Sequence, residues 1–197
     1  MDRTIGLHVV FLLSGVAALL YQLVWQRVLF TIYGIDTTSV TIVVTAFMLG
    51  LGVGSLVGGE LSRRCPKRAL PLFAAVEFGA GAFGIASLPL FAWVAEFTLG
   101  LSRFSTGLVT FLLVLVPTTL MGATLPLLVG HASRITGNVG RSVGSLYFVN
   151  TLGAAVGSFA AVGVLLGAFG LQTTTLVAAA INIGVGVAVL VLRRRAL

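Results

Sequence analysis

Charged side chains are scarce in this chain of 197 residues, and acidic side chains are the scarcest. Asp and Glu together number 5 and Lys and Arg 12, so that all four types make up 9% of the chain. Soluble domains carry roughly 25%, and a globule with so few charges could not cover its surface in water. Hydrophobic residues make up 58%, and the mean hydropathy is +1.13. The composition therefore predicts an integral membrane protein.

Residues that carry metal or covalent chemistry are also few. A single cysteine, Cys65, excludes an internal disulfide, and the two histidines have no metal-ligand spacing. The sequence contains no recognisable nucleophile triad or phosphate-binding glycine loop, so we expect no enzyme activity, no cofactor and no bound metal. The net charge of +7 comes from basic clusters between apolar runs, which is the membrane pattern. Nucleic acid is therefore not an expected partner.

Six apolar runs are long enough to cross a bilayer, which takes about 20 helical residues. They cover, approximately, residues 5–33, 38–61, 69–91, 106–130, 142–169 and 171–192. The predicted fold class is all-α integral membrane, with six transmembrane helices in a single domain over residues 1–197.

Lys and Arg gather on one side of the predicted spans. All but two of the 12 lie at the two termini or in the connections after spans two and four, and the exceptions are Arg27 and Arg103. The positive-inside rule then predicts a multi-pass protein of the plasma (inner) membrane with both termini, Arg3 included, in the cytoplasm. Trp25 and Tyr33 suit an aromatic belt at the membrane surface.

Glycines are plentiful and evenly spaced in two of the spans. Gly50, Gly54 and Gly58 recur every four residues in span two, and Gly153 and Gly157 do so in span five. "LGLGVGS" (49–55) aligns with "LGAAVGS" (152–158) at an offset of 103 residues, in spans of opposite direction. This predicts an inverted three-plus-three repeat, about residues 5–93 and 104–192, as in many secondary transporters. Chance similarity between two Gly-rich helices is the alternative. The stripes predict close packing, in either a static bundle or a moving interface.

Polar side chains within the spans are candidates for function because they are costly in lipid. Glu77 is the clearest, eight residues into span three with no Lys or Arg within one turn. It could bind a cation or a coupling proton, make a structural hydrogen bond, or lie at the interface. Gln22 and Gln26 share one face of span one, and Tyr147 and Asn150 share one face of span five. We predict that these five residues bind substrate, with interhelical hydrogen bonding as the alternative for the last two.

Four stretches carry a family resemblance: "FLLSGVAALLYQLVWQRVL" (11–29), "AFMLGLGVGSLVGGEL" (46–61), "VPTTLMGATLPLL" (116–128) and "GRSVGSLYFVNTLGAAVGSFAAVGVLL" (140–166). They resemble the N-terminal six-helix membrane region of fused major facilitator/spermidine-synthase-like proteins. The resemblance implies half of a major facilitator fold. That family continues into a soluble aminopropyltransferase-like domain, whose motifs these residues lack, so synthase activity is not implied.

The connection after span two resembles the major-facilitator signature G-x-L-x-D-R-x-G-R-R at five positions: Gly59, Leu61, Arg63, Lys67 and Arg68. Ser62 stands at the aspartate position and Pro66 at the later glycine, which puts a gating salt bridge in doubt. Gln22 stands where the family often has glutamate, so an acid that could bind a cation is absent there.

We expect a half-size transporter that pairs with a second copy, or with a related half, and moves a small polar or cationic solute. A polyamine-like solute is implied by the resemblance alone. Helix packing or gating is expected of the glycines named above, of Gly59 and of Arg63. The alternative is a membrane anchor or scaffold subunit for a separately encoded spermidine-synthase-like enzyme.

Overall fold

The computed structural model describes residues 3–33 and 37–194, and these form six helices long and apolar enough to cross a membrane. Five are continuous: α1 (Arg3–Tyr33), α2 (Thr37–Arg64), α3 (Ala69–Phe97), α4 (Arg103–Thr136) and α7 (Gly170–Arg194). The remaining span begins as α5 (Val139–Ala160) and continues through a π-helical stretch, Ala161–Leu165, into the short α6 (Leu166–Ala168). The prediction of an all-α chain is confirmed for the described residues, as is that of six helices long and apolar enough to span a membrane.

Several helices are longer than the apolar runs that predict them. Their ends are set by capping residues, which lie beyond the point where the sequence stops being hydrophobic. α4 starts after Ser102, whose side chain accepts a hydrogen bond from the Ser105 backbone N–H at 3.1 Å. It ends at Gly137, which adopts the left-handed conformation with φ of 69°. Asn138 then caps α5 by accepting from the Arg141 backbone N–H at 2.9 Å. A polar turn at each end is therefore helical as well.

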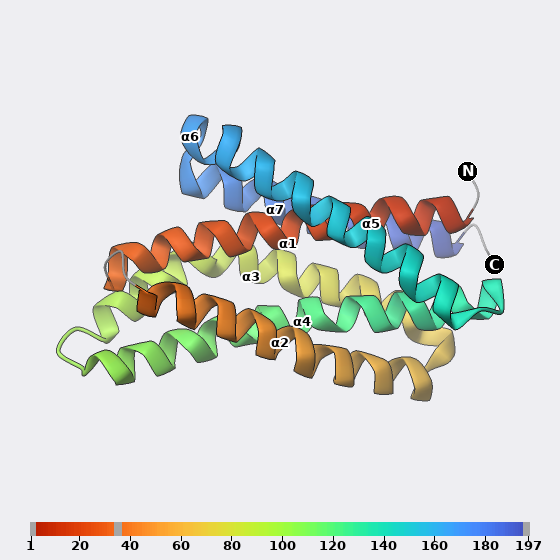
Figure 1. The fold of residues 1–197 in the computed structure, drawn as a ribbon, viewed down its shortest axis with the longest axis horizontal. Helices are drawn as coiled ribbons and strands as arrows, with labels where there is room; N and C mark the ends of the chain where they lie inside the picture. The colour runs from red at the N-terminus through yellow and green to blue at the C-terminus, as the bar shows by residue number, and fades with distance from the viewer. Residues whose placement is uncertain (1–2, 34–36, 195–197) are drawn as a thin grey trace.

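The connections divide the bundle into two ends. The start of α1, the end of α7 and the connections α2–α3 and α4–α5 lie together at one end (Figure 1). We call this the basic end, after its side chains: Arg63, Arg64, Lys67, Arg68, Arg134, Arg141, Arg193 and Arg194. The α3–α4 connection and α6 lie at the far end. The side chains of Arg3, Tyr33 and Arg103 fall outside the described part of the chain.

Helices pack in two kinds of pair. The most extensive contacts join α2 to α4 and α1 to α5, and each of these pairs runs parallel (Figure 1). The helix α3 packs on both α7 and α4, and α7 also packs on α1. Consequently α1 and α4 contact helices on several sides, whereas α2 and α5 each have one main neighbour.

Two hydrophobic clusters fill the interior, one above the other along the helices. The basic-end cluster contains the fully buried Phe11, Phe73, Leu127, Leu128 and Leu146. The far cluster is built around Trp25, which lies against Phe47, Phe83 and Phe91 with ring centroids 5.6–6.3 Å away. The boundary between the clusters falls at the same level of α1, α3 and α7, and this level carries the candidate site.

Candidate functional site

A layer of polar side chains separates the two hydrophobic clusters. On α1, Ser14 lies between Phe11 of one cluster and Ala17 of the other; on α3, Glu77 lies between Phe73 and Ala80. On α7, Asn182 lies between Ala179 and Val185 in the same way. At 1.5 Å per residue, these three positions are about 12–18 Å from the basic end of their helices. We call Ser14, Glu77 and Asn182 the polar layer.

Glu77 is the centre of this layer. Its side chain is 1% exposed, and the Ser14 hydroxyl donates a hydrogen bond to its Oε1 at 2.6 Å. Its other carboxyl oxygen, Oε2, has no hydrogen-bond partner within the described part of the chain. Within the described residues, both ion pairs belong to a different acid, Glu60, so no basic side chain neutralises Glu77. A buried carboxyl without a cationic partner is stable only if it takes up a proton or a cation.

Asn182 and Tyr21 add further polar atoms without protein partners. The Oδ1 of Asn182, the hydroxyl of Tyr21 and the indole nitrogen of Trp25 are buried and unpaired, as is Glu77 Oε2. Each such atom costs about 1–3 kcal/mol when it is left unsatisfied. These four polar atoms lie on α1, α3 and α7, two of them in the polar layer and two in the far cluster.

Small residues on α3 bring the helices together at this level. A Cβ at Gly81 would lie 3.3 Å from the Ala179 carbonyl oxygen and 3.5 Å from the Asn182 Cβ. A Cβ at Gly84 would lie 2.1 Å from the Tyr21 hydroxyl, so the glycine leaves the room that the hydroxyl occupies. The stretch "FGAGAFG" (78–84) therefore sets how closely α1 and α7 approach Glu77.

The tryptophan predicted for the membrane surface is inside the bundle, and that prediction is wrong. Trp25 is 0% exposed and stacks on Tyr21 with ring centroids 5.1 Å apart. The reason is the four-residue spacing of these two side chains, which places both on the face of α1 that packs into the far cluster. The structure places the unpaired indole N–H in the interior, not at a lipid headgroup.

The other predicted substrate-binding residues lie apart from the polar layer. Gln22 and Gln26 are half-buried on α1, beyond the layer toward the far end. On α5, Asn150 donates a hydrogen bond through Nδ2 to the Phe11 carbonyl at 3.0 Å, whereas Tyr147 is 60% exposed. Asn150 thus joins α5 to α1, which is the interhelical alternative that the sequence left open.

The predicted packing glycines lie against neighbouring backbones. A Cβ on Gly50 would come within 2.0 Å of the Thr118 hydroxyl oxygen, and one on Gly54 within 2.1 Å of the Thr119 carbonyl oxygen, both of α4. Gly58 continues this contact at Ala123. On the other side, Gly153 and Gly157 lie against the carbonyls of Leu12 and Val16 of α1. We call these two contacts the α2–α4 seam and the α1–α5 seam.

The signature-like stretch at the end of α2 forms local contacts. Arg63 and Arg64 both pair with Glu60, one turn earlier on the same helix, and Gly59 is half-buried. Ser62, at the position of the missing aspartate, is buried against Gly130 of α4. Its carbonyl accepts a hydrogen bond from Arg134 at 3.1 Å. In this chain a backbone carbonyl therefore binds the arginine of α4.

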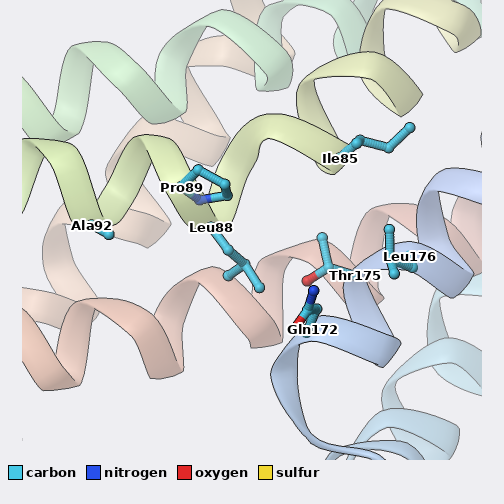
Figure 2. Close-up of a pocket in the computed structure, with 7 residues that line it drawn as sticks. All are labelled: Ile85, Leu88, Pro89, Ala92, Gln172, Thr175 and Leu176. Carbon is cyan, nitrogen blue, oxygen red and sulfur yellow. The ribbon is translucent and has the colours of Figure 1, made fainter.

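A pocket of about 300 Å³ opens between α3 and α7 toward the far end, and its residues were not among the predicted site residues. Figure 2 shows Gln172 and Thr175 of α7 facing Leu88 of α3, with Pro89 nearby. The Thr175 hydroxyl donates to the Leu171 carbonyl of its own helix, which leaves Gln172 as the polar group of the pocket. A sequence signal existed, because Pro89 removes one backbone hydrogen bond inside α3.

Ser14 and Tyr21 were also missed as site residues. They are seven residues apart on α1, and this spacing puts them on one helical face. A lone serine and a tyrosine among apolar residues give no signal of their partner on another helix. Among the described residues, no group of three or more His, Cys, Asp or Glu side chains could hold a metal ion.

Comparison with protein-family models, with curated proteins and with solved structures found no match to this chain.

Proposed function

We propose that this chain is a half-size, major-facilitator-like transporter, and that two copies assemble to move a small polar or cationic solute across the inner membrane. The observation that carries the proposal is Glu77, a carboxyl group buried between two hydrophobic clusters and without a cationic partner among the described residues. Such a group is expensive in a static membrane bundle and useful in a transporter, where it binds a cation or a coupling proton.

An inverted repeat is part of the proposal, and the two seams support it. Gly54 faces the Thr119 carbonyl, and Gly157 faces the Val16 carbonyl. The glycines are 103 residues apart and so are the carbonyls, which is also the offset of the two sequence motifs. In such a repeat, α1 corresponds to α4, α2 to α5 and α3 to α7. The packed pair α2–α4 of one half then corresponds to the packed pair α5–α1 of the other. A repeat whose axis lies in the membrane plane accounts for these correspondences together.

A second copy is proposed to cover α2 and α5. These are the least buried of the six candidate spans, and exposed apolar side chains follow one another along both of them. The start of α1 and the end of α7 lie at the same end of the bundle (Figure 1), and we place this basic end in the cytoplasm, following the positive-inside rule. Two copies would then be parallel, with α2 of each facing α5 of the other across a two-fold axis.

Transport is tested with the purified chain in proteoliposomes, with radiolabelled spermidine, putrescine and tetraethylammonium as probes under an imposed pH gradient. We expect uptake of at least one probe, and Glu77→Gln should lower its initial rate by about tenfold or more. Glu96→Gln is the matched control, because it makes the same change at an exposed position of the same helix. Equal rates for the wild type and Glu77→Gln contradict the role of Glu77; uptake of none of the probes contradicts cation transport.

Pairing is tested by cysteine cross-linking in native membranes, starting from Cys65→Ser. Val53→Cys on α2 and Val156→Cys on α5 are exposed positions separated by the repeat offset. We expect the double variant to yield a covalent dimer. Ile85→Cys with Val187→Cys, exposed on α3 and α7, should remain monomeric. A monomer that instead co-purifies with a soluble synthase-like protein favours the anchor function.

A further inference from the structure

A second cavity, of about 470 Å³, lies at the basic end, apart from the polar layer. Its lining comes from three parts of the chain, namely the α2–α3 connection with the start of α3, the end of α4 and the end of α7. The lining residues are Pro66, Lys67, Leu70, His131, Arg134, Ile135 and Arg193. The transport proposal does not use this cavity.

Three residues of the lining carry a positive charge, namely Lys67, Arg134 and Arg193. Lys67 and Arg193 are exposed, and neither forms an ion pair with any residue that the structure describes. Among the described residues no carboxylate lines the cavity, and Glu60, an acid at the end of α2, is already bound by Arg63 and Arg64. Two unpaired cations from different helices facing one cavity favour an anion between them.

Arg134 holds the wall of the cavity in place. Its guanidinium donates to the Pro66 carbonyl at 2.6 Å and to the Ser62 carbonyl at 3.1 Å. These hydrogen bonds fasten the α2–α3 connection to α4, and with it the backbone that carries Lys67. The site is therefore positioned by the fold rather than by a mobile loop.

Part of the lining is apolar, and this part indicates the kind of anion. Leu70 and Ile135 share the cavity with the three basic side chains. The cavity also lies where the spans end, which is the depth of phospholipid headgroups. A headgroup phosphate with its first acyl carbons matches this combination of basic and apolar lining, and basic pockets between transmembrane helices recognise such headgroups.

We infer that the cavity formed by Lys67, Arg134 and Arg193 binds the phosphate of an anionic phospholipid. Lys67 and Arg193 contact the phosphate, Arg134 orients the connection, and Leu70 and Ile135 pack against the start of the acyl chains. The inference depends on the membrane location of the chain and is independent of what the protein transports.

The test measures phosphatidylglycerol bound to the purified full chain in detergent by native mass spectrometry, with phosphatidylcholine as the neutral lipid. We expect the double variant Lys67→Gln/Arg193→Gln to weaken phosphatidylglycerol binding about tenfold, since a charge-assisted contact is lost at each site. The matched control is Arg68→Gln/Arg194→Gln. It removes two charges from adjacent positions that do not line the cavity, and it should change binding less than about twofold.

Equal weakening by the two double variants overturns the inference, because binding would then follow the overall charge of this end. Equal binding of phosphatidylcholine to the wild type overturns it as well. A separate arm adds inorganic phosphate or glycerol 1-phosphate to the lipid-bound protein. Displacement of the lipid at millimolar concentrations assigns the cavity to a soluble phosphate and contradicts the lipid headgroup; failure to displace it supports the headgroup.

Discussion

The α2–α4 seam and the polar layer hold helices together in opposite ways. In the seam, glycines let one backbone lie directly on another, and the contact is made of carbonyls and small residues. In the polar layer, larger side chains come from α1, α3 and α7, and the Ser14 hydroxyl joins α1 to α3 through its hydrogen bond to Glu77. The seam tolerates no added volume, whereas the layer has spare hydrogen-bonding capacity. The difference suggests rigid pairs at α2–α4 and α1–α5, and an adaptable centre.

The largest expected effect is at the α2–α4 seam. Gly54→Ala adds a Cβ that would lie 2.1 Å from the Thr119 carbonyl oxygen, a backbone atom. The helices must separate, and we expect a loss of stability of about 1–3 kcal/mol, as for other overpacked interiors. Thermal unfolding in detergent, followed by size-exclusion chromatography, measures it.

Gly52→Ala is the control for this variant, since nothing lies within 4 Å of its Cβ. It should be neutral or slightly stabilising, because alanine favours the helix. Equal unfolding temperatures for the two variants would contradict the rigid seam.

A smaller effect is expected for one glycine of the α1–α5 seam, Gly157. Gly157→Ala would place a Cβ 2.6 Å from the Val16 carbonyl oxygen, a less severe overlap than at Gly54. We expect a loss in the same direction, at the lower end of about 1–3 kcal/mol. The same unfolding assay applies, with Gly144→Ala on α5 as the control, because its Cβ meets nothing within 4 Å. If Gly157→Ala left the stability unchanged, the two seams would differ in their packing, and this result would count against the proposed inverted repeat.

In the polar layer, stability should depend on whether one or both partners of a hydrogen bond are removed, rather than on added side-chain volume. Ser14→Ala removes the hydrogen bond to Glu77 and leaves both carboxyl oxygens unpaired, which should cost about 1–2 kcal/mol. The double variant Ser14→Ala/Glu77→Leu removes both polar partners and should recover most of this loss. The unfolding temperatures of Ser14→Ala, Glu77→Leu and the double variant are measured and compared as a double-mutant cycle. Simple additivity of the two losses would show that Ser14 and Glu77 do not interact.

The smallest effect is expected at Asn150. Asn150→Leu removes the hydrogen bond to the Phe11 carbonyl while keeping the side-chain volume. Interhelical hydrogen bonds in membranes average about 0.6 kcal/mol, so the unfolding temperature should fall only slightly. Thr151→Val, at an exposed neighbouring position, should leave it unchanged. A loss as large as that of Gly54→Ala would mean that Asn150 has a role beyond joining α5 to α1.

The six helices and the position of Glu77 could be predicted from the sequence because they depend on local composition. Long apolar runs can only be helices in lipid, where every backbone group must be paired within the segment. An isolated glutamate in such a run is visible without any knowledge of its neighbours. Ser14 could not be found in the same way, because its importance lies in a contact with a residue 63 positions away.

Hydropathy could not predict the exact ends of the helices or the burial of Trp25. Caps such as Ser102 and Asn138 extend helices through polar turns, and hydropathy counts these turns as loops. Trp25 has the composition of an interfacial residue, yet its ring is enclosed by aromatic side chains from α2 and α3. Which side of a wholly apolar helix faces the protein depends on its partners.

The sequence by itself determined that this chain has six helices long and apolar enough to cross a membrane and that one acid, Glu77, lies within an apolar run, since transfer into lipid depends on the composition of each segment. The tertiary structure decided that glycine seams pair α2 with α4 and α1 with α5, that Glu77 meets Ser14, and that Lys67 and Arg193 line one cavity. These are contacts between distant segments, and they are set by how helix surfaces fit, which no single segment encodes.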